Sequence, residues 1–495
     1  MVKIDGHKLS LEEVYRVAYS HEAVVLDAAA REFMNRTRGV VEEKAKGSTP
    51  IYGINTGVGK LSEVKIGAEE VESLQVNIIR SHAVGVGKPL EPPFVRAAIL
   101  LRANTLAKGY SGTRPEVVDK LLEFLNKGIV PYVPEKGSVG ASGDLAPLAH
   151  IALALIGEGY CIEDGRKIPT LKMLDGKGVL PIKLRAKEGL SLINGTQASS
   201  AIIAILLKKS INLLYAANFI SSLVFLAQYG VFEELDERIQ KIRPHEGQKK
   251  VADYMRHLIK DAPVLKERRK VQDAYSIRCI PQVHGAVLDM LEFAKKIIET
   301  EINSTTDNPL VFENGDIISN GNFHGQYPAY AGDVAGIALT TLSSISDRRS
   351  FRLLTPELSM GLPAFLAKNS GINSGFMMLQ VTQASLVAQN RLLAAPASVH
   401  SIPTSGDQED SVSQSMNSAL KLREIYDNTL DTLAIELLIA LQAVRLRGMQ
   451  ILSPRLRSIV ESQLDFIDFV ESDMVYQQDM EKSRDFIENT DFSKI

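Results

Sequence analysis

The chain has 495 residues, of which 45% are hydrophobic and 23% are charged, and its formal net charge is −3. This composition is ordinary for a soluble globular protein, and the length allows two to four domains or one large helical assembly. The weak net charge gives no global field that would indicate nucleic acid or an anionic membrane as a partner. Two cysteines are too few for a disulfide framework or a zinc site, so we expect a cytoplasmic protein.

The first part of the chain is mixed and interrupted by turns. Residues 10–13, with the sequence SLEE, form a capping box that predicts the start of a helix. Further helices are predicted over about 92–108 and 115–127, the second ending at Gly128. Residues 129–134 should be extended because prolines bracket them.

From about residue 195 onward, long segments with helical apolar periodicity dominate. They cover residues 198–232, 283–302, 330–347, 374–393 and 417–446. Several exceed the usual length of a globular helix, which predicts a bundle of long helices rather than a sheet. The predicted organisation is an N-terminal region, residues 1–195, followed by a long-helix domain, residues 196–495.

One stretch resembles a membrane span. No charged residue occurs between Lys209 and Glu233, and the segment is long enough to cross a bilayer. Polar residues within it, among them Asn212, Asn218 and Gln228, favour the alternative of a helix buried on all sides inside a bundle. The N-terminus has no apolar segment of the secretory type. We therefore expect a buried helix and no membrane partner.

The most informative segment is residues 137–150, with the sequence GSVGASGDLAPLAH. Gly137, Gly140 and Gly143 recur every third residue and precede Asp144 and an apolar helical run. Taken as isolated glycines, they are typical of a structural turn that leads into an N-capped helix. A phosphate-binding loop is the other general possibility, but the Lys-Ser/Thr of one nucleotide motif and the GxGxxG spacing of the other are both missing. No nucleotide is expected.

This segment closely resembles the signature of the histidine/phenylalanine ammonia-lyase family. Other segments resemble the family in the same order along most of the chain, and they are YGINTG (52–57), SHAVGVG (81–87), LINGTQ (192–197), QDAYSIRCIPQ (272–282), EINSTTDNPLVF (301–312), GNFHG (321–325), NSGFMMLQVT (373–382) and SIPTSGDQED (401–410). The resemblance implies a mainly α fold, the long-helix bundle of the aromatic ammonia-lyase (fumarase/aspartase-like) type, with a smaller mixed N-terminal region. It also implies a homotetramer whose active sites are shared between subunits.

The resemblance further implies a cofactor made by the chain itself. In the family, an Ala-Ser-Gly tripeptide cyclises to 4-methylidene-imidazol-5-one (MIO), and here the tripeptide is Ala141, Ser142 and Gly143. Gly143 would supply an unhindered amide nitrogen, and Ser142 the hydroxyl that leaves as water. Such an electrophile is needed because no side chain can act as an electron sink when ammonia is eliminated from an amino acid. No cluster of His and Cys has metal-ligand spacing, so no metal is expected.

Individual residues match family positions with known roles. Tyr52 matches the tyrosine proposed as the base for the β-proton, a role that requires nearby positive charge to lower the pKa of the phenol. Arg278 matches the arginine that clamps the substrate carboxylate through its planar donor fork. Positions that hold the ring carbonyl, or the carboxylate, amine and side chain of the substrate, match at Asn194, Gln272, Tyr275 and Phe323.

Two residues indicate the substrate. An imidazole ring offers one donor and one acceptor, which His82 and Glu409 could satisfy together, whereas a phenyl ring would leave Glu409 unpaired. Met377 would line the same pocket. The predicted reaction is deamination of L-histidine to trans-urocanate and ammonia by a carbon–nitrogen lyase. Ser411 stands where histidine enzymes of the family usually have His, so a phenylalanine or tyrosine ammonia-lyase or an MIO-dependent aminomutase stays open, as does the choice between Tyr52 and Glu409 as base.

Overall fold

The computed structural model describes residues 1–495 with the exception of 48–49, 58, 60–63, 65, 68 and 264–269. The chain is mainly α-helical, as predicted, and forms two compact units of three segments each. Unit 1 comprises Met1–Lys208, Ala294–Asp333 and Pro396–Leu422, and unit 2 comprises Lys209–Phe293, Val334–Ala395 and Arg423–Ile495. Unit 1 therefore contains more of the chain than residues 1–195, and the border predicted there stays a prediction.

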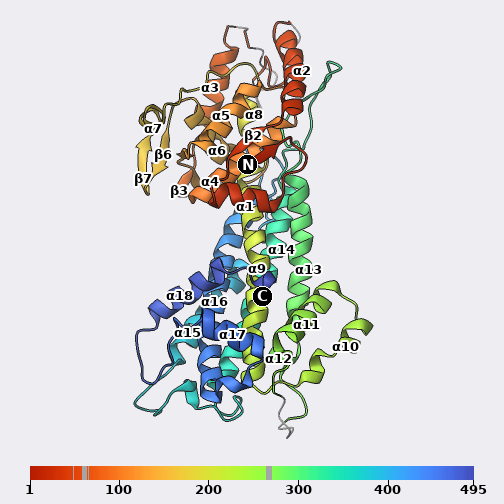
Figure 1. Cartoon of the computed structure of the whole chain (residues 1–495). Helices are drawn as coiled ribbons and strands as arrows, with labels where there is room; N and C mark the ends of the chain where they lie inside the picture. Colours follow the sequence, from red (N-terminus) through yellow and green to blue (C-terminus); the bar gives the residue numbers. More distant parts are fainter. Residues whose placement is uncertain (48–49, 58, 60–63, 65, 68, 264–269) are drawn as a thin grey trace. The chain divides into compact units, whose positions relative to one another are not determined.

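Unit 1 combines helices of moderate length with small sheets (Figure 1). Its helices are α1 Leu11–Tyr19, α2 Ala28–Ala45, α3 Val71–His82, α4 Pro92–Ala107, α5 Pro115–Asn126, α6 Leu145–Leu155, α7 Thr170–Lys177, α8 Glu188–Ile193 and the 3₁₀-helix η4 Ser405–Asp407. Its strands are β1 Val2–Ile4, β2 Val24–Leu26, β3 Val86–Pro89, β4 Val130–Pro131, β5 Pro134–Lys136, β6 Tyr160–Glu163, β7 Arg166–Pro169, β8 Leu310–Val311 and β9 Ile317–Ile318. Strands β1 and β2 pair in parallel, and β3–β5, β4–β6–β7 and β8–β9 pair antiparallel.

Local signals explain where the helices of unit 1 begin and end. The Ser10 hydroxyl accepts a hydrogen bond from the Glu13 backbone at 3.3 Å, and the Glu13 carboxylate accepts one from the Ser10 backbone at 2.9 Å, so the predicted capping box is confirmed. Helix α5 starts at Pro115 and ends just before Gly128, whose φ of 66° favours glycine. The helices predicted over 92–108 and 115–127 are likewise confirmed.

Unit 2 is built mainly from long helices (Figure 1). Two long helices, α9 Gln197–Ala227 and α14 Gln326–Leu354, begin in unit 1 and continue into unit 2. The others with residues in unit 2 are α10 Glu237–Ile242, α11 Glu246–Ile259, α12 Tyr275–Arg278, α13 Ile280–Glu301, α15 Met377–Leu393, α16 Ser415–Arg447, α17 Pro454–Gln463, α18 Gln477–Asn489 and the 3₁₀-helices η2 Phe232–Leu235, η3 Ala364–Leu366, η5 Met449–Ile451 and η6 Phe492–Lys494. The long-helix bundle predicted from the apolar periodicity is confirmed.

A buried polar network links four long helices inside unit 2. Arg349 of α14 donates to both carboxylate oxygens of Glu436 in α16, at 2.5 and 2.9 Å. Its remaining amino group lies 3.1 Å from His284 Nε2 of α13, and His284 Nδ1 lies 2.6 Å from Asn218 Oδ1 of α9. Burial, together with the charge of Arg349, lowers the pKa of His284 well below its usual range, so this histidine is neutral. The network therefore joins α9, α13, α14 and α16 through polar contacts inside unit 2.

Helix α9 is the one helix, among the residues that the structure describes, that is long and apolar enough to cross a membrane. Of its most apolar window, 83% is buried inside the protein. Asn218, Ser221 and Ser222 are completely buried within it, and both hydroxyls donate to backbone carbonyls one turn earlier. The helix is a core helix, and the prediction of a buried helix is confirmed.

Candidate active site

The Ala141–Ser142–Gly143 tripeptide lies in unit 1, in the loop between β5 and α6. Gly143 has a φ of 72° and forms an isolated bridge with Gly195. A Cβ atom at Gly143 would lie 2.2 Å from the Gly195 carbonyl oxygen, which leaves no room for any side chain. The Asp144 backbone N–H donates to that same oxygen at 2.7 Å. The start of α6 and the start of α9 are therefore joined directly beside the tripeptide.

The residues before the tripeptide are held from two other segments of unit 1. The Gly140 carbonyl accepts hydrogen bonds from the Gly325 backbone at 3.0 Å and from the Ser413 hydroxyl at 2.8 Å. The Val139 carbonyl accepts one from the Gln414 backbone at 2.7 Å. With the Gly195 contact, three segments distant in the sequence hold this short loop. They give it a defined bent conformation, which a cyclisation between neighbouring residues requires.

Ser142 is held on both sides by side chains that the sequence had singled out. Its hydroxyl donates a hydrogen bond to Glu409 Oε1 at 2.6 Å. Its carbonyl oxygen accepts one from Asn194 Nδ2 at 3.0 Å. The other amide atom of Asn194, Oδ1, is buried and has no hydrogen-bond partner among the described residues. The structure therefore brings together the central serine and two other predicted site residues.

Glu409 carries a negative charge that its surroundings stabilise. Partial burial raises the pKa of its carboxyl group, but hydrogen bonds from Ser142, Thr404 and Ser405 and the charge of His82 lower it, and the net pKa lies below the usual value. The Thr404 hydroxyl donates to Glu409 Oε2 at 2.6 Å and the Ser405 hydroxyl at 2.9 Å. Glu409 is thus a fixed carboxylate acceptor directed at the tripeptide.

Tyr52 lies in a different electrostatic setting from the one expected of a base. Burial raises the pKa of its phenol, the carboxylates of Asp307 and Glu409 raise it further, and a hydrogen bond from the Gly59 backbone at 3.3 Å only partly offsets them. The expectation that neighbouring positive charge lowers this pKa is not met within unit 1. A cation from elsewhere would be required.

His82 and Phe323 complete the predicted residues of unit 1. His82 is the last residue of α3, and its Nδ1 lies 2.8 Å from the Ile78 carbonyl oxygen. A carbonyl can only accept, so Nδ1 carries a proton and Nε2 is left for a further partner. Phe323 is half-buried in the turn whose Gly325 contacts the tripeptide loop.

The remaining predicted residues lie in unit 2. The guanidinium of Arg278 donates to Gln272 Oε1 and lies 4.9 Å from the centre of the Tyr275 ring. Tyr275 is the first residue of α12 and is 72% exposed. Met377 is the first residue of α15. The structure thus forms two groups of predicted residues, one in each unit.

Arg102 of α4 is a site residue that the sequence reasoning missed. Its buried guanidinium donates to the Asn194 carbonyl at 2.9 Å, to Gln197 Oε1 at 2.8 Å and to the Ser191 carbonyl. Burial lowers the pKa of Arg102 to about 10, and the charge of Asp307 partly opposes this. The available signal was an arginine inside a mainly apolar helix, which is typical of a buried group with a structural partner, but Arg96 in the same helix carries the same signal.

The contacts of Asp144 also differ from those expected of the cap of its own helix. It occupies the N-cap position of α6 but makes no capping bond there. Its carboxylate instead accepts from the Ser199 backbone at 2.7 Å and hydroxyl at 2.8 Å, in the first turn of α9, and from the Ser138 hydroxyl at 3.0 Å. Burial raises its pKa, which these hydrogen bonds oppose. Asp144 therefore fastens the tripeptide loop to the start of α9.

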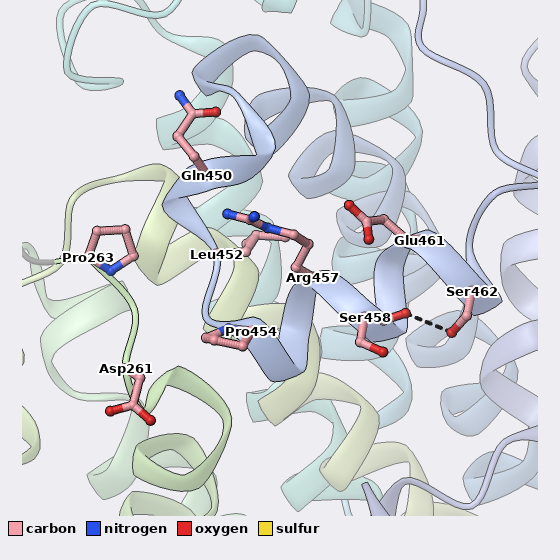
Figure 2. Close-up of a pocket in the computed structure, with 9 residues that line it drawn as sticks. All are labelled: Asp261, Pro263, Gln450, Leu452, Pro454, Arg457, Ser458, Glu461 and Ser462. Atoms are coloured by element: carbon pink, nitrogen blue, oxygen red, sulfur yellow. Dashed lines mark hydrogen bonds between the residues drawn. The ribbon is translucent and has the colours of Figure 1, made fainter.

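Two of the cavities formed by the described residues, one in each unit, lie apart from the predicted site residues. One of about 640 Å³ in unit 2 lies beside α17, where Arg457 and Glu461 line it and Ser462 donates to the Ser458 carbonyl at 2.7 Å (Figure 2). The other, about 550 Å³ in unit 1, is lined in part by Glu301. Neither is lined by a predicted site residue. Among the described residues, no group of three His, Cys, Asp or Glu side chains could hold a metal ion.

Comparison with known proteins agrees with this fold. The sequence profile named aromatic amino acid lyase matches residues 9–463. The histidine ammonia-lyase of Geobacillus thermodenitrificans is 46% identical over 483 residues, which cover 97% of this chain and 96% of the relative. Among solved structures, the tyrosine aminomutase of Streptomyces globisporus superposes with a TM-score of 0.96 at 37% identity, covering 100% of this chain and 98% of that one. The histidine ammonia-lyase of Trypanosoma cruzi gives 0.93 at 38%, covering 100% and 94%.

The fold, the site and these matches first define a class of enzyme. The protein is a carbon–nitrogen lyase built on a helical bundle. More particularly, the chain belongs to the aromatic amino acid lyase family, because the family profile covers nearly the whole sequence.

Proposed function

We propose that this protein removes ammonia from L-histidine to give trans-urocanate, using an MIO group formed from Ala141, Ser142 and Gly143. The observation that carries this proposal is the set of contacts on Ser142, whose hydroxyl and carbonyl are each held by a side chain, Glu409 and Asn194. The tight approach of Gly143 to Gly195 fits such a group, since only glycine can occupy that position. When formed, MIO supplies an electrophilic methylidene carbon that no side chain provides.

Glu409 and His82 are proposed to select the imidazole side chain. Glu409 is a stabilised carboxylate and accepts a ring N–H, while the second ring nitrogen pairs with His82. The charge of His82 acts on Glu409, so the two lie within electrostatic range of each other. A phenyl ring offers neither donor nor acceptor and would leave the Glu409 carboxylate desolvated without a partner, at a cost of about 1 to 3 kcal/mol.

The other predicted residues are proposed to bind the carboxylate and the amine of the substrate. The planar guanidinium of Arg278 binds the carboxylate, and Gln272 and Tyr275 beside it orient that pair. Asn194 Oδ1, which has no partner among the described residues, is available to accept from the substrate amine. Phe323 and Met377 pack against the substrate side chain.

We propose that the protein acts as a homotetramer with shared active sites. Apolar side chains remain exposed along three long helices, at Met290 and Phe293 of α13, Tyr327, Tyr330, Ile337 and Phe351 of α14, and Met378, Val381 and Leu392 of α15. Exposed apolar side chains in such number favour association with further copies of the chain. Arg278 of a second subunit would also provide the positive charge that Tyr52 requires as a base. We place the protein in the cytoplasm, where both free cysteines would stay reduced.

The competing proposal within the family is a tyrosine or phenylalanine lyase or an aminomutase. The tyrosine aminomutase of Streptomyces globisporus has nearly the same fold, so fold alone does not separate these reactions. Glu409 disfavours a phenylalanine substrate, since a charged acceptor fits an imidazole and not a phenyl ring. A tyrosine hydroxyl could donate to Glu409, so the reaction product decides between tyrosine and histidine.

The test is an assay of purified protein against a panel of L-amino acids, with Ser142→Ala as control. Urocanate should form from histidine, and the wild-type peptide that contains Ser142 should be lighter than its encoded mass by two waters. Ser142→Ala should keep the encoded mass for its sequence and lose nearly all activity. Cinnamate, coumarate or a β-amino acid as the main product would reject the histidine assignment, and an unmodified wild-type peptide would reject the cofactor.

A further inference from the structure

The loop that carries Glu409 is built to hold its carboxylate in one place. Thr404 and Glu409 form an antiparallel bridge, with backbone hydrogen bonds of 2.9 and 3.3 Å in the two directions. Between them Ser405, Gly406 and Asp407 all have positive φ, from 52° to 68°. Two of these three are not glycine, so the backbone is strained, which is a feature of functional loops. The loop turns Glu409 back onto the hydroxyls of Thr404 and Ser405, and its second oxygen is left to face Ser142.

The oxygen that Glu409 contacts is the one that must leave during maturation. Ring closure joins the amide nitrogen of Gly143 to the carbonyl carbon of Ala141, and the Ala141 oxygen departs as water with the amide protons of Gly143 and Ser142. A second water then consists of the Ser142 hydroxyl and the proton on Ser142 Cα. Loss of this second water creates the methylidene.

We propose that Glu409 is the acid–base residue for this second dehydration, an inference that rests on the proposed function. The Glu409 carboxylate accepts the Cα proton of Ser142. The electron pair of that C–H bond forms the Cα–Cβ double bond as the Cβ–Oγ bond breaks. Glu409 then returns the proton to the departing oxygen, so that water leaves and the carboxylate is regenerated. One carboxylate suffices because it already lies 2.6 Å from Oγ.

Asn194 makes the same step easier from the other side of Ser142. Its amide donates to the Ser142 carbonyl, which is bonded directly to Cα. Negative charge that develops on this carbonyl when the Cα proton is removed is stabilised by that donor. The positive ends of α6 and α9, which start at Leu145 and Gln197, lie next to the tripeptide and act in the same direction.

The proposal gives Glu409 two consecutive tasks. Before maturation, its Oε1 is occupied by the hydroxyl of Ser142. Once that oxygen has left as water, Oε1 has lost its donor and faces the site with a vacant lone pair. The same atom then accepts the ring N–H of the substrate. The pocket thus becomes complete only when the cofactor is finished.

The experiment follows the mass of the peptide containing Ser142 in newly synthesised full-length protein, quenched at intervals and digested. Glu409→Gln keeps the shape of the side chain but cannot take up a proton. The matched control is Asp410→Asn, which neutralises the exposed neighbouring carboxylate. Wild type and Asp410→Asn should lose two waters together. Glu409→Gln should accumulate a peptide that has lost one water and is cyclised, with the second loss slowed by at least about tenfold.

Each other outcome of this experiment contradicts either the inference or the proposed function. If Glu409→Gln loses both waters at the wild-type rate, the inference is wrong while the proposed function stands. If its peptide keeps the encoded mass, Glu409 acts on ring closure or on loop shape and the inference is also wrong. An unmodified wild-type peptide would instead reject the proposed function itself.

A second variant protects the test against misfolding of Glu409→Gln. Thr404→Val retains the carboxylate but removes one of the donors that lower its pKa. The pH at which the second dehydration reaches half its maximal rate should therefore move upward. A purely structural role for Glu409 would leave that midpoint unchanged, and an unchanged midpoint overturns the proposal.

Discussion

Gly143→Ala should stop the chain from forming the proposed MIO group, and the structure allows the size of the effect to be worked out. With a φ of 72°, Gly143 occupies the left-handed region, where a side chain costs about 1 to 2 kcal/mol. The new Cβ would also lie 2.2 Å from the Gly195 oxygen, so one of the two backbones must move by more than about 1 Å to reach ordinary contact. That movement breaks the 2.7 Å bond from Asp144 to Gly195 and adds about 1 to 3 kcal/mol.

Gly128→Ala is the matched control for this prediction. Gly128 has a similar φ of 66°, but a Cβ there would meet nothing within 4 Å. This variant should lose only the conformational contribution, about 1 to 2 kcal/mol in urea unfolding, and should mature normally. Gly143→Ala should lose about 2 to 5 kcal/mol, and its Ser142 peptide should keep the encoded mass. If Gly143→Ala lost two waters at the wild-type rate, the argument that backbone proximity to Gly195 shapes the tripeptide would be refuted.

Three other predictions follow from the same structure. Burial raises the pKa of Glu301 from 4.5 to about 6. Its ionised form therefore lowers the free energy of unfolding by about 1 to 2 kcal/mol above pH 6 and has no effect below pH 4.5. Glu301→Gln should raise stability in urea at pH 8 and leave it unchanged at pH 4. Arg102→Met should lower stability by about 3 to 5 kcal/mol and reduce kcat in fully matured protein, because Arg102 holds the backbone of Asn194. The control is Arg96→Met, which removes a buried arginine bonded only to backbone carbonyls away from the site. This variant should lower stability without the loss in kcat. Leu392→Glu, at a side chain that is 81% exposed, should reduce the mass of the assembly in native mass spectrometry while the isolated subunit remains folded by circular dichroism.

Much of the fold follows from local signals in the sequence. Capping at Ser10 and the proline–glycine pair around α5 depend on neighbouring residues only, and the structure reproduces them. The boundaries of the long helices were less accurate. The apolar pattern continues to residue 232, but α9 ends at Ala227 because Tyr229 takes a φ of 53° and Gly230 packs against a nearby ring. Helix α14 starts before its first predicted residue because Pro328 is tolerated in a first turn.

The site was less accessible to sequence reasoning where it depends on contacts between distant segments. The tripeptide and Glu409 could be picked out by motif, yet their separation of 2.6 Å joins positions 267 residues apart. Arg102 acts through the backbone of Asn194, and no motif marks such a contact. Asp144 looks like the cap of its own helix, but its backbone angles direct the carboxylate to α9 instead. In each case the tertiary arrangement decides among several partners that local chemistry permits.

The two units differ in what they contribute to the candidate site. Every contact described on the tripeptide, from Asn194, Gly195 and Glu409, comes from unit 1. The proposed role of Tyr52 as base meets an electrostatic obstacle, because burial and the carboxylates of Asp307 and Glu409 raise the pKa of its phenol. A nearby cation would oppose this effect, and under the proposed homotetramer Arg278 of a second subunit supplies it. Under that proposal turnover depends on assembly, whereas the contacts described on the tripeptide lie within unit 1 of one chain.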